Sequence, residues 1–361
     1  MNNQNDIIVS ICSITYNHAP YIRQCLDGFL MQKTNFKYEI LVHDDCSTDG
    51  TTEIIREYAK KYPNIIIPIL QSVNQYQNGN KRILATFVFP KARGKYIALC
   101  EGDDYWTDPL KLQKQVDYME KHEECGMCYT KFDILLSSNN IILHDVYETI
   151  PQRFQKVSDL ATWIEKTPFV APMTWIARNE LWKSSPQIPS PDGTFIYFAN
   201  FLDKTITHCI DGPSTAVYRI AEESASHTNS IKKEYERKKA LYYTKISLVD
   251  YYKAKLSNTK ELKTKISRIY YNRCLLWIIL NKDTIELNKA LNILGNDLTL
   301  KQKLFLLIFK SNIVRRIYSC IFKHKTKIRK MLNWDTKLLR EYRKHVNLNK
   351  RKYPIYYKEL K

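Results

Sequence analysis

Two groups of carboxylate side chains give this sequence its clearest chemical signal. Asp44 and Asp45 follow one apolar run, and a denser group follows another, with Glu101, Asp103 and Asp104 inside four residues. Carboxylates this close repel one another unless a cation joins them. Oxygen ligands of this kind are preferred by Mg²⁺ and Mn²⁺. The spacing therefore predicts a divalent cation site in the second group, with a solvated acidic turn as the alternative.

Both acidic groups stand at the ends of predicted strands. Residues 7–13, 38–43, 65–70 and 95–100 are short apolar runs of the kind found in buried strands. Apolar residues at helical spacing separate them, beginning after Pro20. Alternating strands and helices predict a mostly parallel sheet with helices on both faces. Ligands bind beyond the carboxyl ends of such strands, so the two acidic groups can converge on one site.

The glycine-rich sequences that usually cradle phosphates are absent. Neither G-x-G-x-x-G nor G-x-x-x-x-G-K-[ST] occurs in the chain. A nucleotide diphosphate bound here would need a cation to neutralise it, which makes Mn²⁺ or Mg²⁺ the predicted cofactor. Lys81 and Arg82 follow a polar loop at residues 74–80 and can reach a phosphate. Ordinary surface charge is the alternative for both.

Composition and cysteine usage indicate a globular protein of a reducing compartment. The 361 residues are 44% hydrophobic and 12% aromatic, which excludes a disordered chain. Nine cysteines are scattered, and only Cys125 and Cys128 form a C-x-x-C pair, too few for a structural zinc site. The polar first residues do not resemble a secretory signal. A cytoplasmic location is therefore expected.

The charge is distributed very unevenly along the chain. Residues 1–230 contain 22 Lys and Arg against 27 Asp and Glu, a net of −5. Residues 231–361 contain 34 basic against 10 acidic residues, a net of +24. This contrast predicts a catalytic domain over residues 1–228 and a basic, mainly helical region over residues 229–361.

Three segments, in this order, resemble family 2 glycosyltransferases of the GT-A fold. They are residues 9–18 (VSICSITYNH), 39–51 (EILVHDDCSTDGT) and 94–109 (GKYIALCEGDDYWTDP). The resemblance covers roughly residues 7–225. It implies an α/β, nucleotide-diphospho-sugar transferase fold with a mostly parallel central sheet, followed here by the basic α-helical region. It also implies transfer of a hexosyl or hexosaminyl group from a nucleotide-sugar.

The same resemblance assigns residues to the nucleotide. It places Thr15, Tyr16 and Asn17 beside the nucleobase, with Asp45 accepting a hydrogen bond from it. A carboxylate acceptor suits the N–H of uracil, so a UDP-sugar donor is favoured. For Asp49 we prefer a turn or helix-cap role over a binding role.

For the cation, the resemblance makes Asp104 the first-choice ligand. It has Asp103 contact either the ribose or the side chains that bind the cation. Glu101 stands where many relatives have Asp and is a further candidate ligand. Relatives often carry a His after Tyr-Arg-x, but that position here is Ala221. His227 follows further on and is the remaining candidate, with a structural histidine as the alternative.

The catalytic base implied by the resemblance lies in the second half of the domain, before a helix. Asp192 in the segment 189–197 is our candidate, and helix N-capping after a proline is its alternative role. Asp203 and Asp211 are the fallback candidates. One carboxylate base and one displacement at the anomeric carbon predict an inverting transfer.

The basic region has a membrane-surface pattern near its end. Dense apolar positions between residues 304 and 322 precede the polybasic run 323–330. An apolar helix beside such a run is typical of an interfacial helix on anionic lipid, so a peripheral location on the inner face of the membrane is expected. A helical subdomain that packs on the sheet is the alternative. No nucleic-acid motif accompanies the charge.

The sequence thus predicts a metal-dependent, inverting glycosyltransferase that acts on a lipid- or glycan-linked acceptor in surface polysaccharide biosynthesis. A nucleotidyltransferase and a non-catalytic membrane-associated scaffold are the alternatives. The loop after the first predicted strand lacks the glycines usual in nucleotidyltransferases.

Overall fold

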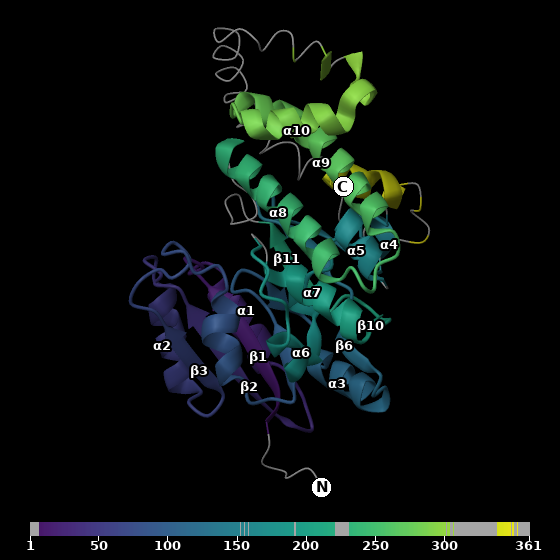
Figure 1. The fold of residues 1–361 in the computed structure, drawn as a ribbon. Helices are drawn as coiled ribbons and strands as arrows, with labels where there is room; N and C mark the ends of the chain where they lie inside the picture. The colour runs from purple at the N-terminus through teal and green to yellow at the C-terminus, as the bar shows by residue number, and fades with distance from the viewer. Residues whose placement is uncertain are drawn as a thin grey trace.

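The computed structural model contains an α/β half and a helical half (Figure 1). It describes residues 7–151, 153–154, 156–157, 159–190, 193–220, 231–300, 302–303, 306, 338–347, 349 and 352. In Figure 1 the helices α8, α9 and α10 lie at the end of the molecule opposite to β1, β2 and β3.

The main sheet has seven strands in the order β10-β6-β9-β4-β1-β2-β3. Its strands are β1 (Ile7–Thr15), β2 (Lys37–Asp44), β3 (Ile66–Leu70), β4 (Tyr96–Leu99), β6 (Cys125–Tyr129), β9 (Ile176–Arg178) and β10 (Ile206–Cys209). Only β9 runs antiparallel to its neighbours, so the predicted mostly parallel sheet is confirmed. Pro68 lies in β3 at the sheet edge, where its missing N–H costs no ladder bond.

A second sheet of four strands, in the order β5-β11-β7-β8, was not foreseen from the sequence. Its strands are β5 (Tyr105–Trp106), β7 (Asp133–Leu136), β8 (Ile141–Leu143) and β11 (Ala216–Ile220). Strand β11 pairs antiparallel with β5 and parallel with β7. Because β5 directly follows the second acidic group, this sheet carries residues 216–220 to that group.

The helices of the α/β half pack through apolar faces on the two sheets and on one another. They are α1 (Ile22–Leu30), α2 (Thr51–Lys61), α3 (Lys111–Lys121), α4 (Val146–Thr149), α5 (Leu160–Lys166), α6 (Asn179–Lys183) and α7 (Gly193–Lys204). The apolar face predicted for α1 comprises Ile22, Cys25, Leu26, Phe29 and Leu30. The first four are fully buried, and Leu30 is partly buried. Residues 84–91 form a π turn and a 3₁₀ turn instead of a regular helix, because Pro90 interrupts the backbone pattern.

The helical half comprises α8 (Ile231–Tyr251), α9 (Thr259–Leu280) and α10 (Thr284–Leu294), and residues 338–347 form a further helix. Helix α8 docks on the α/β half, where Thr244 Oγ1 donates to the Pro189 carbonyl at 2.9 Å. The helix at 338–347 returns to the same half, where Glu341 pairs with Arg153 at 2.5 Å. These contacts agree with the packed helical subdomain that was the alternative to the membrane helix.

Most residues on which the membrane interpretation rests, including the run 323–330, lie outside the described part of the chain. The proposed boundary near residue 228 also lies there. Within the described residues, no helix is both long and apolar enough to cross a membrane.

A lysine is buried in the packing beneath the second acidic group. Lys111, the first residue of α3, is fully buried, and its Nζ donates to Gln115 Oε1 at 2.5 Å. The same ammonium lies 4.4 Å from the centre of the Trp106 ring, a cation–π contact. Burial lowers the pKa of Lys111 to about 8. The Lys111 ammonium thus stabilises the position of the Trp106 ring, but burying its charge costs solvation free energy.

We expect this cost to depend on pH. Below pH 8 Lys111 is protonated in the folded and the unfolded chain, so the full burial cost is present. Between pH 8 and 10.5 the unfolded chain binds the additional proton, so this contribution to stability rises with pH. The free energy of unfolding of Lys111→Met minus that of wild type should therefore fall by about 3 kcal/mol from pH 7.5 to 10.5, measured by urea unfolding. A pH-independent difference would contradict this.

Candidate functional site

The second acidic group lies directly against the end of β1. Strand β4 pairs parallel with β1, and Gly102 N donates to the Ile14 carbonyl at 3.0 Å. A Cβ atom on Gly102 would lie 2.7 Å from Thr15 Oγ1 and 3.1 Å from His18 Nδ1. Glycine at 102 is therefore what lets the acidic loop approach the β1 end so closely.

The loops after β1 and β2 are joined by hydrogen bonds. Asn17, in a left-handed conformation with φ 55°, accepts from Thr48 N at 2.8 Å and donates its own N–H to Ser47 Oγ. Asp49 accepts from Ala19 N at 2.9 Å and from the N–H of Thr51. The turn role preferred for Asp49 agrees with this geometry. The side chain of Asn17, predicted to contact a nucleobase, also holds the loop after β2 in place by accepting the Thr48 N–H.

The two acids after β2 differ in their surroundings. Asp44 accepts from the hydroxyls of Ser47 and Thr52 and is a turn residue. The Asp45 side chain accepts two backbone N–H groups, from Gln75 at 2.8 Å and from Tyr76 at 3.0 Å. Each carboxylate oxygen keeps a second lone pair, so Asp45 can still accept from a ligand.

Asp104 is the most deeply buried acid of the second group, at 3% exposure. Its Oδ1 accepts from Arg219 N at 2.8 Å. Burial raises the pKa of Asp104 well above its usual range, and the charges of Asp103 and Glu101 raise it further. The group is therefore electrostatically arranged for a positive partner.

Asp103 keeps a free oxygen beside two other unpartnered polar atoms. Asp103 Oδ1, Thr15 Oγ1 and His18 Nδ1 are all buried without a hydrogen-bond partner. His18 Nε2 lies 3.8 Å from Asp103 Oδ2. Unpartnered buried polar atoms are rare and mark places where a ligand or water completes the bonding. Glu101 is exposed beside them.

His18 is a site residue that the sequence interpretation missed. Its signal was its place in the segment 9–18, one residue after Asn17. Across the described residues, no three or more His, Cys, Asp and Glu side chains are grouped so as to hold a metal ion.

Arg219 of β11 fastens the acidic loop from the second sheet. Its Nε donates to the Asp103 carbonyl at 2.8 Å, and its Nη2 donates to Gln24 Oε1 at 2.6 Å. Its guanidinium carbon lies 4.6 Å from the Tyr21 ring centre and 5.4 Å from that of Tyr105. Arg219 thus holds the backbone of the acidic loop through its side chain and the Asp104 carboxylate through its backbone N–H.

Arg82 lies close to the beginning of α7. Burial raises the pKa of Tyr197 in α7, and a hydrogen bond from the Arg82 guanidinium partly offsets this rise. The candidate base Asp192 directly precedes α7 in the sequence. Asp192 and His227 themselves fall outside the described residues.

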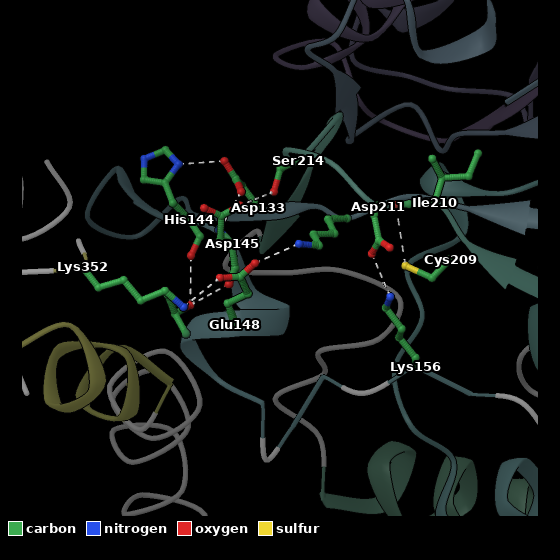
Figure 2. Close-up of polar contacts among 12 residues, drawn as sticks. Asp133, His144, Asp145, Glu148, Lys156, Cys209, Ile210, Asp211, Ser214 and Lys352 are labelled. Carbon is green, nitrogen blue, oxygen red and sulfur yellow. Dashed lines mark hydrogen bonds and ion pairs between the residues drawn. The ribbon is translucent and has the colours of Figure 1, made fainter. Parts of the chain in front are cut away.

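The fallback acids are engaged in ion pairs. Asp203 pairs with Lys255 at 2.6 Å, and Asp211 pairs with Lys156 at 2.9 Å (Figure 2). These contacts make both acids less suited to act as a base.

Figure 2 also shows how the second sheet is braced. Asp133 Oδ2 lies 2.7 Å from His144 Nδ1, and Asp133 Oδ1 accepts from Asp145 N at 3.0 Å. Lys131 pairs with Glu148 at 2.9 Å. These contacts tie β8 and α4 to β7, the strand that pairs with β11.

Comparison with known families identifies the first half of the chain. Residues 10–184 match the model described as Glycosyl transferase family 2. An uncharacterized protein of Mycobacterium tuberculosis (strain ATCC 25618 / H37Rv) is 52% identical over 122 residues, 34% of this chain and 34% of the relative. The putative teichuronic acid biosynthesis glycosyltransferase TuaG of Bacillus subtilis (strain 168) is 29% identical over 128 residues, 36% of this chain and 48% of the relative. The chain thus spans less than half of these relatives.

Solved structures share the fold at low sequence identity. Staphylococcus aureus TarS 1–349, in complex with UDP-GlcNAc, superposes with a TM-score of 0.55 and 18% identity, covering 80% of each chain. A mannosyltransferase from Pyrobaculum calidifontis, in complex with GDP-Man and Mn²⁺, superposes with a TM-score of 0.50 and 15% identity, covering 92% of this chain and 89% of its own. These likenesses support the fold.

Gly102→Ala should destabilise the protein. The added methyl group must push the acidic loop away from Thr15, and overpacking of this kind costs about 1–3 kcal/mol. The matched control is Gly193→Ala, whose Cβ would meet only Tyr197 Cε2 at 3.7 Å. The control should stay within about 1 kcal/mol of wild type in urea unfolding. Equal stability of the two variants would contradict the close contact.

Proposed function

Because residues 10–184 belong to glycosyl transferase family 2 and adopt a GT-A fold, we propose that this chain transfers a sugar from a nucleotide-sugar to an acceptor hydroxyl. The observation that carries the proposal is that the two acidic groups lie at the carboxyl ends of strands on either side of β1 in the main sheet. Strands β2 and β4 flank β1 in parallel, and Asp45 and the pair Asp103–Asp104 follow their ends. A base-recognising acid beside a cation-binding group is what a nucleotide diphosphate requires.

The proposed donor is a UDP-sugar carrying a hexosyl or hexosaminyl group. Asp45 as an acceptor fits the N–H of uracil, and TarS, which shares the fold, was solved with UDP-GlcNAc. The proposed acceptor is lipid- or glycan-linked, in surface polysaccharide biosynthesis. The relative named for teichuronic acid biosynthesis supports this acceptor class.

Mn²⁺ or Mg²⁺ is the proposed cofactor, and the unpartnered Asp103 oxygen beside the buried Asp104 carboxylate supports a positive partner here. Asp104, Glu101 and His227 remain proposed ligands from the sequence. The structure favours Asp103 as an additional ligand, because Asp103 Oδ1 is unpartnered whereas Asp104 Oδ1 is bonded to Arg219 N. When bound, the cation would neutralise the charge that grows on the leaving diphosphate.

The proposed mechanism is a single in-line displacement. Asp192 takes the proton from the acceptor hydroxyl, whose oxygen attacks the anomeric carbon opposite the diphosphate. The bond between that carbon and the diphosphate oxygen breaks, and the configuration inverts. Arg82, whose positive charge lies near the Tyr197 side chain of α7, is proposed to contact the diphosphate.

The proposed location is cytoplasmic, peripheral on an anionic membrane surface. The net charge of +24 in residues 231–361 supports this partner. A lipid-linked acceptor would make the location useful.

The deciding experiment incubates the full chain with a panel of nucleotide-sugars and measures release of free nucleoside diphosphate, with Mn²⁺, with Mg²⁺ and with chelator. We expect UDP release that requires the cation. In a parallel incubation with nucleoside triphosphate and sugar 1-phosphate, release of pyrophosphate would instead indicate the alternative nucleotidyltransferase. No release in either incubation would favour the non-catalytic scaffold. Equal rates in chelator would disprove the cation requirement.

Asp192→Asn should reduce sugar transfer by at least 100-fold while leaving the Kd for UDP within about twofold, because general base catalysis contributes 10²–10⁴-fold. Transfer is measured by product formation and binding by calorimetry. Asp203→Asn is the matched control, because Asp203 is an acid of α7 already paired with Lys255. Full activity of Asp192→Asn would remove it as the base. Loss of activity in Asp203→Asn alone would move the role there.

A further inference from the structure

The loop between β3 and residue 83 is folded onto the carboxylate proposed to recognise the nucleobase. Gln75 N and Tyr76 N donate to the two oxygens of Asp45, which is only 5% exposed. Within the loop, Gln77 N donates to Asn74 Oδ1 at 2.7 Å. Two backbone bonds to one carboxylate fix the position of residue 76 relative to that carboxylate.

The ring of Tyr76 is fixed by a second contact within the loop. Lys81 Nζ lies 3.4 Å from the ring centre and donates to the Tyr76 carbonyl at 2.7 Å. The carboxylate of Asp45 raises the pKa of Lys81 against the larger lowering effect of desolvation, which places the ammonium in the field of Asp45. Although the cation covers part of the ring, Tyr76 remains 42% exposed.

A second exposed aromatic residue lies next to the residue that bonds to the Asp45 backbone. Tyr16 follows the end of β1 and is 38% exposed. The backbone of Asp45 is bonded to the preceding residue, with Asp45 N donating to the Thr15 carbonyl at 3.1 Å. Asp45 is thus bonded to Tyr76 itself and to the residue before Tyr16, which belong to two different loops. Exposed aromatic rings beside a fixed hydrogen-bond acceptor are suited to a flat heterocycle.

We propose that Tyr76, placed by Asp45 and Lys81, stacks on the nucleobase, in addition to the contact proposed for Tyr16. The inference rests on the proposed function and adds a residue that the sequence did not single out. Asp45 supplies the acceptor for the base N–H, and Tyr76 supplies the apolar contact area. The ligand class is a pyrimidine nucleoside diphosphate.

The test is calorimetric titration of the full chain with UDP and, separately, with inorganic pyrophosphate, both with Mg²⁺. Base–aromatic stacking contributes about 1–3 kcal/mol, so Tyr76→Ala should raise the Kd for UDP about 5- to 150-fold. Pyrophosphate carries no base, so its Kd should be unchanged. Tyr76→Phe keeps the ring and should bind UDP within about twofold of wild type.

Val73→Ala is the matched control, because Val73 is an exposed apolar residue of the same loop at 48% exposure. It should leave both affinities unchanged. Equal weakening of UDP and pyrophosphate by Tyr76→Ala would show that the residue only shapes the loop and would overturn the proposal. Unchanged UDP binding in Tyr76→Ala would overturn it directly. If the wild-type chain binds UDP no more tightly than pyrophosphate, it does not recognise the nucleoside. That result would contradict the proposed function itself, independently of Tyr76.

Discussion

The hydrogen bond from the Arg219 backbone to the buried Asp104 carboxylate joins the two sheets at the acidic site. Asp104 ends the loop that follows β4, and Arg219 belongs to β11 of the second sheet. Without this bond a carboxylate at 3% exposure would lack a strong donor, a costly state for a buried charge. The same residue returns a side-chain bond to the Asp103 carbonyl, so β11 fixes both the buried acid and the backbone beside it.

This constraint divides the roles of the two adjacent acids. One oxygen of Asp104 accepts the Arg219 backbone N–H, whereas Asp103 keeps a buried oxygen without a partner. Close approach at Gly102 brings Thr15 and His18 to the same place. The histidine that relatives carry after Tyr-Arg-x is missing at Ala221, yet His18 brings an imidazole to the acids from the loop after β1. The electrostatics of the site are therefore built from loops that are distant in the sequence.

The basic region also packs against the α/β half. Helix α8 bonds to the carbonyl of Pro189, and Glu341 pairs with Arg153. Most basic side chains of a helical subdomain can remain in solvent while its apolar faces pack, so a high net charge and a docked position are compatible. The basic region can therefore pack on the α/β half and still present basic side chains to a membrane surface.

The sequence by itself determined the parallel sheet, the face of α1 and the positions of the acidic groups at strand ends, because these follow from local periodicity and from the direction of parallel strands. Only the tertiary structure decided how each acid is used. Burial, the donor from Arg219 and the loop bonds to Asp45 all come from segments distant in the chain. The second sheet escaped prediction because its strands are two to five residues long and lack a periodic signal of their own. The local sequence pattern placed the acids at the carboxyl ends of the strands. Long-range packing gave Asp104 a backbone donor and left an oxygen of Asp103 without one.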